Sequence, residues 1–315
     1  MIEDWCSKTV RVRVPATSAN VGAGFDCLGF AVTLYSELEL TLTSKSGLDF
    51  QLEGEGSDEI VPEDENIVWN SIRKMLERIE TPQKILGAKM KMKNSIPLSR
   101  GLGSSAAAIV SGLFAANECL DNPLNREQIL DLATEIEGHP DNVAPALNGN
   151  FTVNVMKKFE DRIQVDSFNF KPQVDLKFIA AIPNFHLETK KARAVLPTSI
   201  SRADAIFNIS RVAMLIASLS TGEEKFLSET FDDRLHQPYR MNLIPGMSEV
   251  FKAAKESGAI GACLSGAGPC LIAFTLPKLK NEIEISNSMR DAFSKFGIES
   301  RVEILDLDSN GAVVI

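Results

Sequence analysis

Hydrophobic and polar residues alternate in several short stretches of the first half of the chain. Valines alternate with arginines over 10–14, and the same period of two recurs over 38–42 and 88–92. A period of two is typical of β-strands that bury one face. A nearly continuous apolar run over 176–182 predicts a strand buried on both faces, at the start of the second half.

Other stretches place their apolar residues three and four positions apart, which predicts amphipathic helices. Asn66 is the expected N-cap of the first helix, and Asn125 and Gln128 have the spacing of a capping box. Ser104 and Ser105 are the N-cap candidates of an Ala-rich helix. The helices expected from these patterns are 66–79, 104–119, 126–137, 201–219, 245–256 and 280–296.

The order of these elements predicts an α+β fold with mainly antiparallel sheets. The second half adds strands over about 259–264, 270–275 and 299–305. The chain has 315 residues, and a single core rarely grows beyond about 250–300 residues. We therefore expect an N-terminal domain over 1–170 and a C-terminal domain over 171–315.

Composition restricts the class of partner and the compartment. The net charge of −9 argues against nucleic-acid binding. The five cysteines form no CxxC pair, which fits a reducing, intracellular compartment. No signal-peptide pattern and no apolar run of about 18–20 residues is present, so we expect a cytoplasmic protein that binds no membrane. His186 and His236 are interpreted as structural or surface residues, and the cysteines as buried small hydrophobes.

A glycine-rich loop precedes the Ala-rich helix. Residues 97–107 read Pro-Leu-Ser-Arg-Gly-Leu-Gly-Ser-Ser-Ala-Ala. Gly101 and Gly103 permit backbone conformations that side chains forbid. The helix that follows directs free N–H groups and the positive end of its dipole toward the loop, which suits phosphate. From these residues alone, a tight turn before a packed helix is the alternative, and the GxxxxGK[ST] pattern is absent.

The same run resembles the ATP loop of the GHMP kinases, the superfamily of galactokinase, homoserine kinase, mevalonate kinase and phosphomevalonate kinase. The resemblance implies an N-terminal half like the second domain of ribosomal protein S5 and a ferredoxin-like C-terminal half. It implies that a loop serine and a later glutamate hold Mg²⁺, with Ser105 the first candidate serine and Ser104 the next. The residues implied to bind ATP are Pro97, Leu98, Ser99, Arg100, Gly101, Leu102, Gly103, Ser104, Ser105, Ala106 and Ala107.

An earlier segment narrows the substrate. Residues 15–30 read Pro-Ala-Thr-Ser-Ala-Asn-Val-Gly-Ala-Gly-Phe-Asp-Cys-Leu-Gly-Phe, which is similar in nearly every residue to the first motif of homoserine kinases. By that resemblance Asn20 and Asp26 contact an amino acid substrate. An aspartate that faces an α-ammonium group makes a charge-assisted pair. A Gly-rich turn capped by Asn and Asp is the alternative reading of the residues alone.

A polar segment follows at 137–150, with the sequence Glu-Gly-His-Pro-Asp-Asn-Val-Ala-Pro at its start. The matching homoserine kinase segment implies that His139 and Asn142 line the substrate pocket and that Glu137 binds Mg²⁺. Some members have more residues between the glutamate and the histidine, so Glu135 remains a second metal candidate. Mevalonate kinase and galactokinase carry a catalytic aspartate in this region, whereas Asn142 stands here, so no general base is assigned.

Two later segments complete the match. The run Thr-x-x-x-Arg at Thr189 and Arg193 resembles one that supplies a threonine near the transferred phosphate and an arginine for the substrate carboxylate. Arg240, in His-Gln-Pro-Tyr-Arg, resembles a second carboxylate-binding arginine, and two planar guanidinium groups suit a carboxylate. Residues 261–271 resemble the third GHMP motif, which implies that backbone N–H groups near Gly266 close over the site.

The matching motifs extend from residue 15 to residue 275 in the order of the family. They imply ATP-dependent, Mg²⁺-assisted phosphorylation of the hydroxyl of L-homoserine to O-phospho-L-homoserine, in threonine biosynthesis, by a homodimer. Asn142, Thr189 and Arg193 would form the catalytic group. The rivals are a GHMP kinase that acts on a sugar or a mevalonate-like acid, and a catalytically silent ligand sensor with a broken loop or lost metal ligands.

Overall fold

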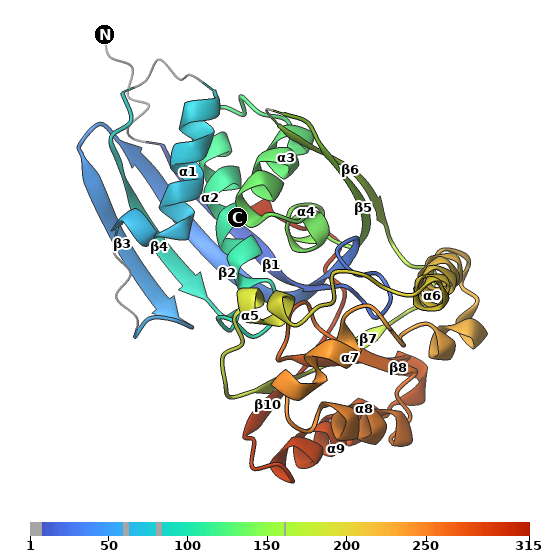
Figure 1. Cartoon of the computed structure of the whole chain (residues 1–315). Helices are drawn as coiled ribbons and strands as arrows, with labels where there is room; N and C mark the ends of the chain where they lie inside the picture. Colours follow the sequence, from blue (N-terminus) through green and yellow to red (C-terminus); the bar gives the residue numbers. More distant parts are fainter. Residues whose placement is uncertain (1–7, 59–62, 80–83, 161) are drawn as a thin grey trace.

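Two antiparallel-rich sheets form the framework of the chain (Figure 1), in a computed structural model that describes residues 8–58, 63–79, 84–160 and 162–315. The first sheet has the order β11-β1-β2-β4-β3, and a β5–β6 hairpin continues it from the other end of β2. All its neighbours are antiparallel except β3 and β4. Its strands are β1 (Thr9–Ala19), β2 (Leu28–Thr43), β3 (Gly47–Gly54), β4 (Gly87–Asn94), β5 (Phe151–Lys158), β6 (Ile163–Phe170) and β11 (Val313–Val314).

Four helices cover one face of this sheet (Figure 1). The side chain of Asn66 accepts a hydrogen bond from the backbone N–H of Trp69, so the expected N-cap is confirmed. The expected capping box of Asn125 and Gln128 is also confirmed. The four helices are α1 (Ile67–Arg78), α2 (Ser104–Cys119), α3 (Arg126–Glu137) and α4 (Pro140–Asn148).

The second sheet has the order β10-β7-β9-β8, and its elements follow a βαββαβ sequence with α9 in the second crossover. This order is that of a ferredoxin-like domain, and α8 and α9 pack against one face of it. The strands are β7 (Lys177–Pro183), β8 (Gly261–Leu264), β9 (Leu271–Thr275) and β10 (Ser300–Leu305). The helices are α5 (Thr189–Ala194), α6 (Arg202–Thr221), α7 (Gln237–Arg240), α8 (Met247–Glu256) and α9 (Glu282–Ser294).

The predicted division of the chain at 170/171 falls between β6 and β7, which belong to different sheets. The last residues return to the first sheet, where β11 pairs with β1, with Val314 opposite Val12. A cluster of stacked and tilted aromatic rings joins the two sheets. Phe30 lies 4.8 Å from Phe151 and 4.6 Å from Phe178 between ring centroids, so the two halves share one core at this point.

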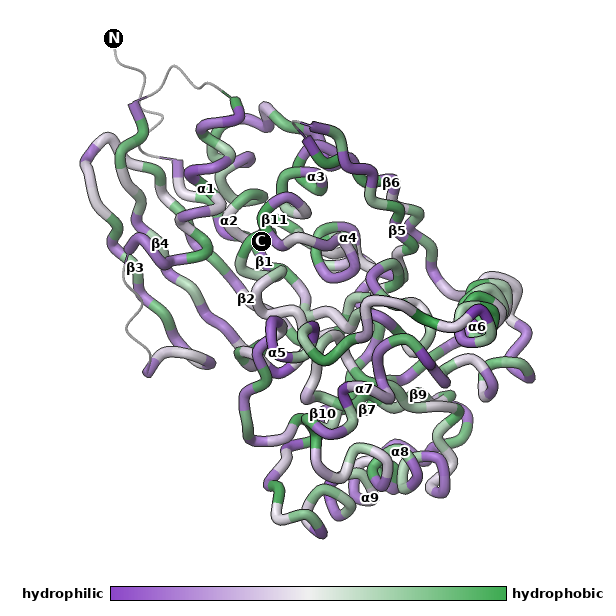
Figure 2. Tube along the Cα trace, in the orientation of Figure 1, coloured by the Kyte–Doolittle hydropathy of each residue, from purple (hydrophilic) through white to green (hydrophobic). Residues whose placement is uncertain are grey.

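Among the described residues, helix α6 alone is long and apolar enough to cross a membrane, whereas the sequence predicted no such segment. Its length and composition are sufficient for a span, and it is largely green in the hydropathy colouring of Figure 2. One face of α6 packs on protein, because Leu215 and Leu219 are buried. Asn208, on the same helix, is buried and donates to the carbonyl of Ala23 and to Asp233. These contacts are those of a surface helix of a folded protein.

Two expectations about small elements need correction. The N-cap of α2 is Gly103 in the left-handed region, and Ser104 and Ser105 are the first helical residues. Cys27 is only partly buried, whereas Cys119, Cys263 and Cys270 are buried as expected; Cys6 lies outside the described residues. Burial raises the pKa of the Cys27 and Cys119 thiols to about 11, which makes them poor nucleophiles at neutral pH.

Candidate active site

A cavity of about 320 Å³ lies where the two halves of the chain meet. Its walls come from the β1–β2 loop, the glycine loop with the start of α2, the start of α4, α5, α7 and the turn between β8 and β9. The predicted site residues that line it are Asn20, Asp26, Leu98, Ser99, Arg100, Gly101, Gly103, Ser104, Ser105, Glu137, His139, Asn142, Thr189, Arg193, Arg240 and Gly266. The structure therefore brings together side chains that are more than 200 residues apart in the sequence.

The N-terminus of α2 forms one end of this cavity. Gly101 and Gly103 both have positive φ, at 82° and 68°, which turns the chain sharply into the helix. No side chain caps the helix, and within the described chain the backbone N–H groups of Ser104 and Ser105 donate to no acceptor. Free N–H groups at the start of a 16-residue helix form a site suited to phosphate.

Hydrogen bonds from the C-terminal half hold the glycine loop in place. Ser265 donates from Oγ to the carbonyl of Gly101 at 2.6 Å, and the N–H of Cys270 donates to the carbonyl of Arg100 at 3.0 Å. A Cβ at Gly101 would lie 2.3 Å from the backbone oxygen of Ser265. Glycine at 101 is therefore required for the contact between the loop and the second domain as well as for the turn.

Ser105 and Glu137 meet beside the helix start. Ser105 Oγ donates to Glu137 Oε2 at 2.8 Å, and no Lys or Arg within the described residues lies at ion-pair distance from Glu137. Burial raises the pKa of Glu137, against smaller lowering effects from Ser105 and His139. When burial raises the pKa of a carboxylate in this way, a nearby cation stabilises its ionised form.

The rival glutamate is engaged elsewhere. Glu135 pairs with Arg78 at 2.6 Å through Oε2, and its Oε1 accepts from the backbone N–H of Ile163 at 3.2 Å. It does not line the cavity. The geometry thus favours Glu137 over Glu135 as the partner of Ser105.

The start of α4 presents three polar side chains to the cavity. The Nδ1 atom of His139 lies 2.6 Å from a carboxylate oxygen of Asp141. Burial lowers the pKa of His139, but the hydrogen bond and charge of Asp141, together with Glu137, outweigh it and raise the pKa overall. Asn142 accepts at Oδ1 from Thr17 Oγ1 at 2.8 Å, and its amide nitrogen has no partner within the described chain.

Asp26 and Arg193 bind each other across the opposite wall. The two terminal nitrogens of Arg193 donate to the two oxygens of Asp26, at 2.7 and 2.9 Å, in a bidentate pair. The sequence predicted separate roles for these residues, with Asp26 for an ammonium and Arg193 for a carboxylate. In the chain alone they neutralise each other, and the guanidinium of Arg193 also lies 5.7 Å from the ring centre of Phe25.

Arg240 is in the opposite situation, because it is buried without an acidic partner. Its side chain is among the largest that are fully buried, and no carboxylate of the described residues lies within ion-pair distance. Nε donates to the carbonyl of Ala192 at 3.0 Å, and Nη1 donates to the carbonyl of Gly266 at 3.0 Å. Burial, reinforced by the charge of Arg193, lowers the pKa of Arg240 to about 10. Arg240 therefore remains positively charged at neutral pH, and a bound anion would compensate its buried charge.

Some sequence predictions change in detail. The N–H of Gly266, expected to face the ligand, donates to the carbonyl of Ala19, and the carbonyl of Gly266 holds Asn20 and Arg240. Asn20 lines the cavity, but its Oδ1 accepts from the N–H of Asp26. Within the loop, Leu102, Ala106 and Ala107 are buried in the core and do not line the cavity. Their side chains pack the start of α2 against the core.

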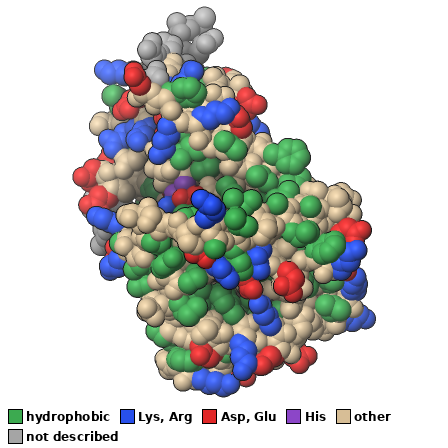
Figure 3. All heavy atoms as spheres, turned by 45° about the vertical axis from the view of Figure 1, so that its right-hand side comes forward, with side chains coloured by type: hydrophobic (Ala, Val, Ile, Leu, Met, Phe, Trp, Pro, Cys, Tyr) green, Lys and Arg blue, Asp and Glu red, His purple; other side chains and the backbone are tan. Residues whose placement is uncertain are grey.

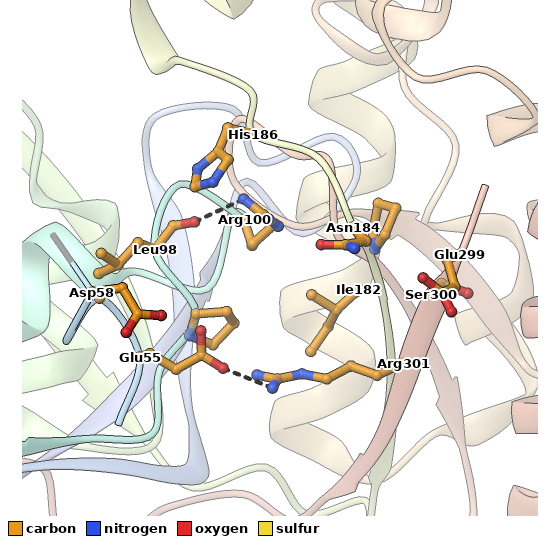
Figure 4. A pocket seen from close by; sticks show the side chains of 13 residues that line it. Glu55, Asp58, Leu98, Arg100, Ile182, Asn184, His186, Glu299, Ser300 and Arg301 are labelled. Carbon is orange, nitrogen blue, oxygen red and sulfur yellow. Dashed lines mark hydrogen bonds and ion pairs between the residues drawn. The ribbon is translucent and has the colours of Figure 1, made fainter. Parts of the chain in front are cut away.

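Pro97 lines a second cavity, of about 440 Å³, on the far side of Leu98 from the helix start. Figure 4 shows this cavity with Arg100 above it and with Glu55 joined to Arg301 at its lower edge. The Glu55–Arg301 distance is 2.7 Å, and it links the turn after β3 with β10 of the other domain. Arg100 donates to the carbonyl of Leu98 at 3.1 Å within the loop, and its side chain lines both cavities.

Sequence reasoning overlooked several residues that line or support the site. Ile67, Ala108 and Leu187 line the main cavity, and Thr17 holds Asn142. Asp141, by contrast, belongs to the polar segment 137–150 that the sequence singled out; it lines the cavity and orients His139. Thr17 lies within the 15–30 segment that was singled out, whereas the apolar wall carried no chemical signal of its own in the sequence.

The ferredoxin-like half, the uncapped glycine-loop helix and the shared cavity agree with what the resemblance to the GHMP kinases implies. The profile of the GHMP kinases N terminal domain matches residues 66–150, and that of the GHMP kinases C terminal domain matches residues 220–295. The homoserine kinase of Desulfitobacterium hafniense is 42% identical over 97% of this chain and 100% of its own length. The homoserine kinase of Moorella thermoacetica is 43% identical over 96% and 99%.

A solved structure agrees with these relatives. The crystal structure of homoserine kinase from Cytophaga hutchinsonii has a TM-score of 0.87 and 32% sequence identity, and the match covers 100% of this chain and 98% of that one. The chain belongs to the homoserine kinase family of the GHMP kinases. The predicted GHMP fold is thereby confirmed, and so is the expectation of a kinase that uses ATP.

Proposed function

We propose that this chain transfers the γ-phosphoryl group of ATP to the hydroxyl of L-homoserine, giving ADP and O-phospho-L-homoserine, a step of threonine biosynthesis. The observation that carries the proposal, beside family membership, is Arg240. A buried cation without an acidic partner calls for an anion, and it lies in the same cavity as the uncapped helix start. The α-carboxylate of an amino acid supplies that anion.

Homoserine offers three groups, and the cavity offers a complement to each. Its carboxylate would bind the unused side of Arg240, with Arg193 beside it. Its ammonium would bind Asp26, since an ionised carboxylate has about four acceptor positions and Arg193 occupies two of them. Its hydroxyl would then point toward the start of α2, where the phosphates of ATP would be held by backbone N–H groups.

The residues present fit a magnesium ion. Ser105 and Glu137 supply a hydroxyl and a carboxylate, which are the oxygen ligands that Mg²⁺ prefers, and no Lys or Arg of the described residues lies at ion-pair distance from Glu137. Within that described part, no cluster of three His, Cys, Asp or Glu side chains is present, so phosphate oxygens and water would complete the shell. When bound, the ion would neutralise phosphate charge.

The chain's own contribution to the reaction would be positioning. Asn142 has an amide nitrogen free to hold an oxygen of the substrate, and Thr189, at the first position of α5, lines the cavity near Arg193. No side chain is assigned as a general base. Phosphoryl transfer proceeds through a loose transition state, in which alignment and charge stabilisation contribute more than proton removal.

The assembly and compartment remain predictions. We expect a homodimer in the cytoplasm. The described cysteines Cys27, Cys119, Cys263 and Cys270 are all free thiols, in keeping with a reducing compartment. Light scattering coupled to gel filtration would give the mass of the particle, and a monomer at micromolar concentration would contradict the dimer.

A coupled ADP-release assay with Mg-ATP tests the proposal. L-homoserine would be compared with L-serine, L-threonine, mevalonate and galactose. The variants would be R193A and, as a matched control on the same helix, K191A, whose lysine pairs with exposed Glu188 and with no other described residue. We expect turnover of homoserine alone, lost in R193A and kept in K191A. Turnover of another alcohol would overturn the substrate, and ATP binding without turnover of any would favour a ligand sensor.

A further inference from the structure

His236 is a fully buried histidine that the proposed reaction does not use. It lies at the N-cap position of α7, one turn before Arg240. Its Nε2 lies 2.8 Å from the carbonyl oxygen of Gly22, and its Nδ1 lies 3.3 Å from Nη1 of Arg240. Its ring stacks on Phe25 with centroids 5.2 Å apart and planes 23° from parallel. The sequence analysis treated this residue as structural or surface, and the structure shows that it touches the substrate-binding arginine.

The atoms around the two ring nitrogens determine which nitrogen carries the proton, and the carboxylate oxygen Oδ2 of Asp233, 3.5 Å from Nε2, favours a proton on that nitrogen. A backbone carbonyl only accepts and a guanidinium only donates. Nε2 therefore donates to Gly22, and Nδ1 accepts from Arg240, so the ring is neutral. A protonated ring would place an N–H against an N–H of Arg240 and a second positive charge beside it.

The ring itself is held in place by its own segment. Asp233 accepts from the backbone N–H groups of Leu235, His236 and Gln237, at 2.7 to 2.9 Å. Asn208 of α6 donates to the same carboxylate at 2.6 Å. Asp233 thereby fixes the start of α7, on which both the histidine and the arginine depend.

The guanidinium of Arg240 thus donates hydrogen bonds to three acceptors. Ala192 holds Nε, Gly266 and His236 hold Nη1, and Nη2 makes no hydrogen bond to the described residues. Of these three acceptors, two are backbone carbonyls and only His236 is a side chain. The free Nη2 belongs to the side of the guanidinium that is left for a ligand.

We propose that His236 is a positioning residue, whose neutral ring accepts a hydrogen bond from Arg240 and so aims the free side of that guanidinium at the carboxylate of the amino acid substrate. The inference rests on the proposed function, because it assumes that Arg240 binds the carboxylate of the substrate. It then assigns to His236 the role of orienting Arg240. It also makes binding of the amino acid sensitive to the protonation of a group outside the reacting atoms.

Charged groups surround His236 on each side. Arg240 lies on its own helix, Asp233 in the turn before it, Asp26 in the β1–β2 loop, and Arg193 on α5 beyond Phe25. Burial is the first cause that lowers the pKa of His236, and Arg240 adds to it, while Asp233, the bond to Gly22 and Asp26 oppose it. The net direction is downward, so the ring is neutral at physiological pH.

The sign of the pH effect follows from this direction. The unfolded histidine takes up a proton near pH 6.5, whereas the folded one does so only at lower pH. Its contribution to stability is full above about pH 6.5 and is lost as the pH falls from there toward the folded pKa. The KM for the amino acid should rise at the acid end, while the KM for ATP should not follow it.

Two conservative variants separate the two hydrogen bonds of the ring. In H236N the amide lies where Nδ1 was, so it can still accept from Arg240 but cannot reach Gly22. In H236Q the amide lies where Nε2 was, so it can donate to Gly22 but leaves Arg240 without its acceptor. We expect H236Q to raise the KM for homoserine about tenfold, with kcat and the KM for ATP nearly unchanged, and H236N to stay within about threefold of the parent.

A double-mutant cycle with R240M completes the test. If His236 acts through Arg240, H236Q should have no further effect on the homoserine KM in the R240M background. Thermal unfolding of every variant reports the structural part separately. Equal KM values for H236N and H236Q, or KM changes that simply follow the loss of stability, would overturn the inference. No effect of R240M itself on the homoserine KM would instead overturn the proposed carboxylate site, which distinguishes the two failures.

Discussion

The two ends of the cavity are built in opposite ways. At the proposed phosphate end, the candidate binding groups are backbone N–H groups of a single continuous segment, and the carboxylate of Glu137 has no Lys or Arg of the described residues at ion-pair distance. At the proposed carboxylate end, the candidate binding groups are side chains from three separate segments, and the cation Arg240 has no carboxylate of the described residues at ion-pair distance. Each end lacks the partner of opposite charge, which suggests a cation at one end and an acid group of the substrate at the other.

The Arg240 end should be the more sensitive of the two. Replacing Arg240 by methionine keeps the length of the side chain and removes the charge. The loss of a desolvated ionic partner costs about 2–5 kcal/mol, so the homoserine kcat/KM should fall by a factor between about 30 and about 5000. R290M, on the exposed face of α9, is the matched control and should keep full activity. Equal activity of R240M and the parent in the coupled assay would remove the contrast between the two ends.

At the phosphate end, E137Q should lower the apparent affinity for Mg²⁺ at least tenfold, because the carboxylate beside Ser105 loses its charge. The raised pKa of Glu137 means that its ionised form disfavours the metal-free fold, so stability falls as pH rises through that pKa. E137Q should remove this pH dependence in thermal unfolding without metal. E135Q is the control, since Glu135 pairs with Arg78, and its Mg²⁺ titration should match the parent. The reverse result would assign the metal to Glu135.

Gly101 lies where the glycine loop contacts Ser265 of the C-terminal domain. The substitution G101A should lower the free energy of unfolding by about 2–4 kcal/mol and abolish turnover. An alanine at position 101 would have to adopt a left-handed backbone conformation, and its Cβ would also clash with the backbone carbonyl of Ser265. G297A has a similar positive φ but meets nothing within 4 Å, so it should cost only about 1–2 kcal/mol. Urea titration of both proteins measures the difference, and equal losses would show that the contact with Ser265 is unimportant.

The smallest effect is expected at the second cavity. Glu55 and Arg301 form a partly exposed pair between the domains, and such pairs contribute at most about 1 kcal/mol. E55Q should therefore shift urea unfolding only slightly and leave both KM values unchanged. A large rise in the KM for ATP would show that this link controls the glycine loop.

The two ends also differed in how far the sequence predicted them. The loop 97–107 could be interpreted from adjacent residues, because a helix start and two glycines are local features that favour phosphate. The pairing of Asp26 with Arg193, 167 positions apart, could not be read from spacing, since it depends on how α5 meets the β1–β2 loop. The same holds for the contact between His236 and Gly22, because no local pattern separates such a histidine from a surface one.

Among the elements, helices with caps were predicted closely, and strands less so. Asn66 and the pair Asn125 and Gln128 fixed two helix starts, because their side chains bond directly to the backbone. The alternating stretch 38–42 covers only part of β2. The opening residues of this strand are buried on both faces, so the period of two is lost there. The hairpin of β5 and β6 carries mixed polar faces and gave no clear signal.

The most direct measurement compares three alcohols on the parent enzyme and on R240M. They are L-homoserine, 4-hydroxybutanoate without the ammonium, and 3-amino-1-propanol without the carboxylate. The account predicts that the parent prefers homoserine over 3-amino-1-propanol by at least 100-fold in kcat/KM, and that R240M loses most of this preference. A parent enzyme that phosphorylates 3-amino-1-propanol as well as homoserine would contradict it.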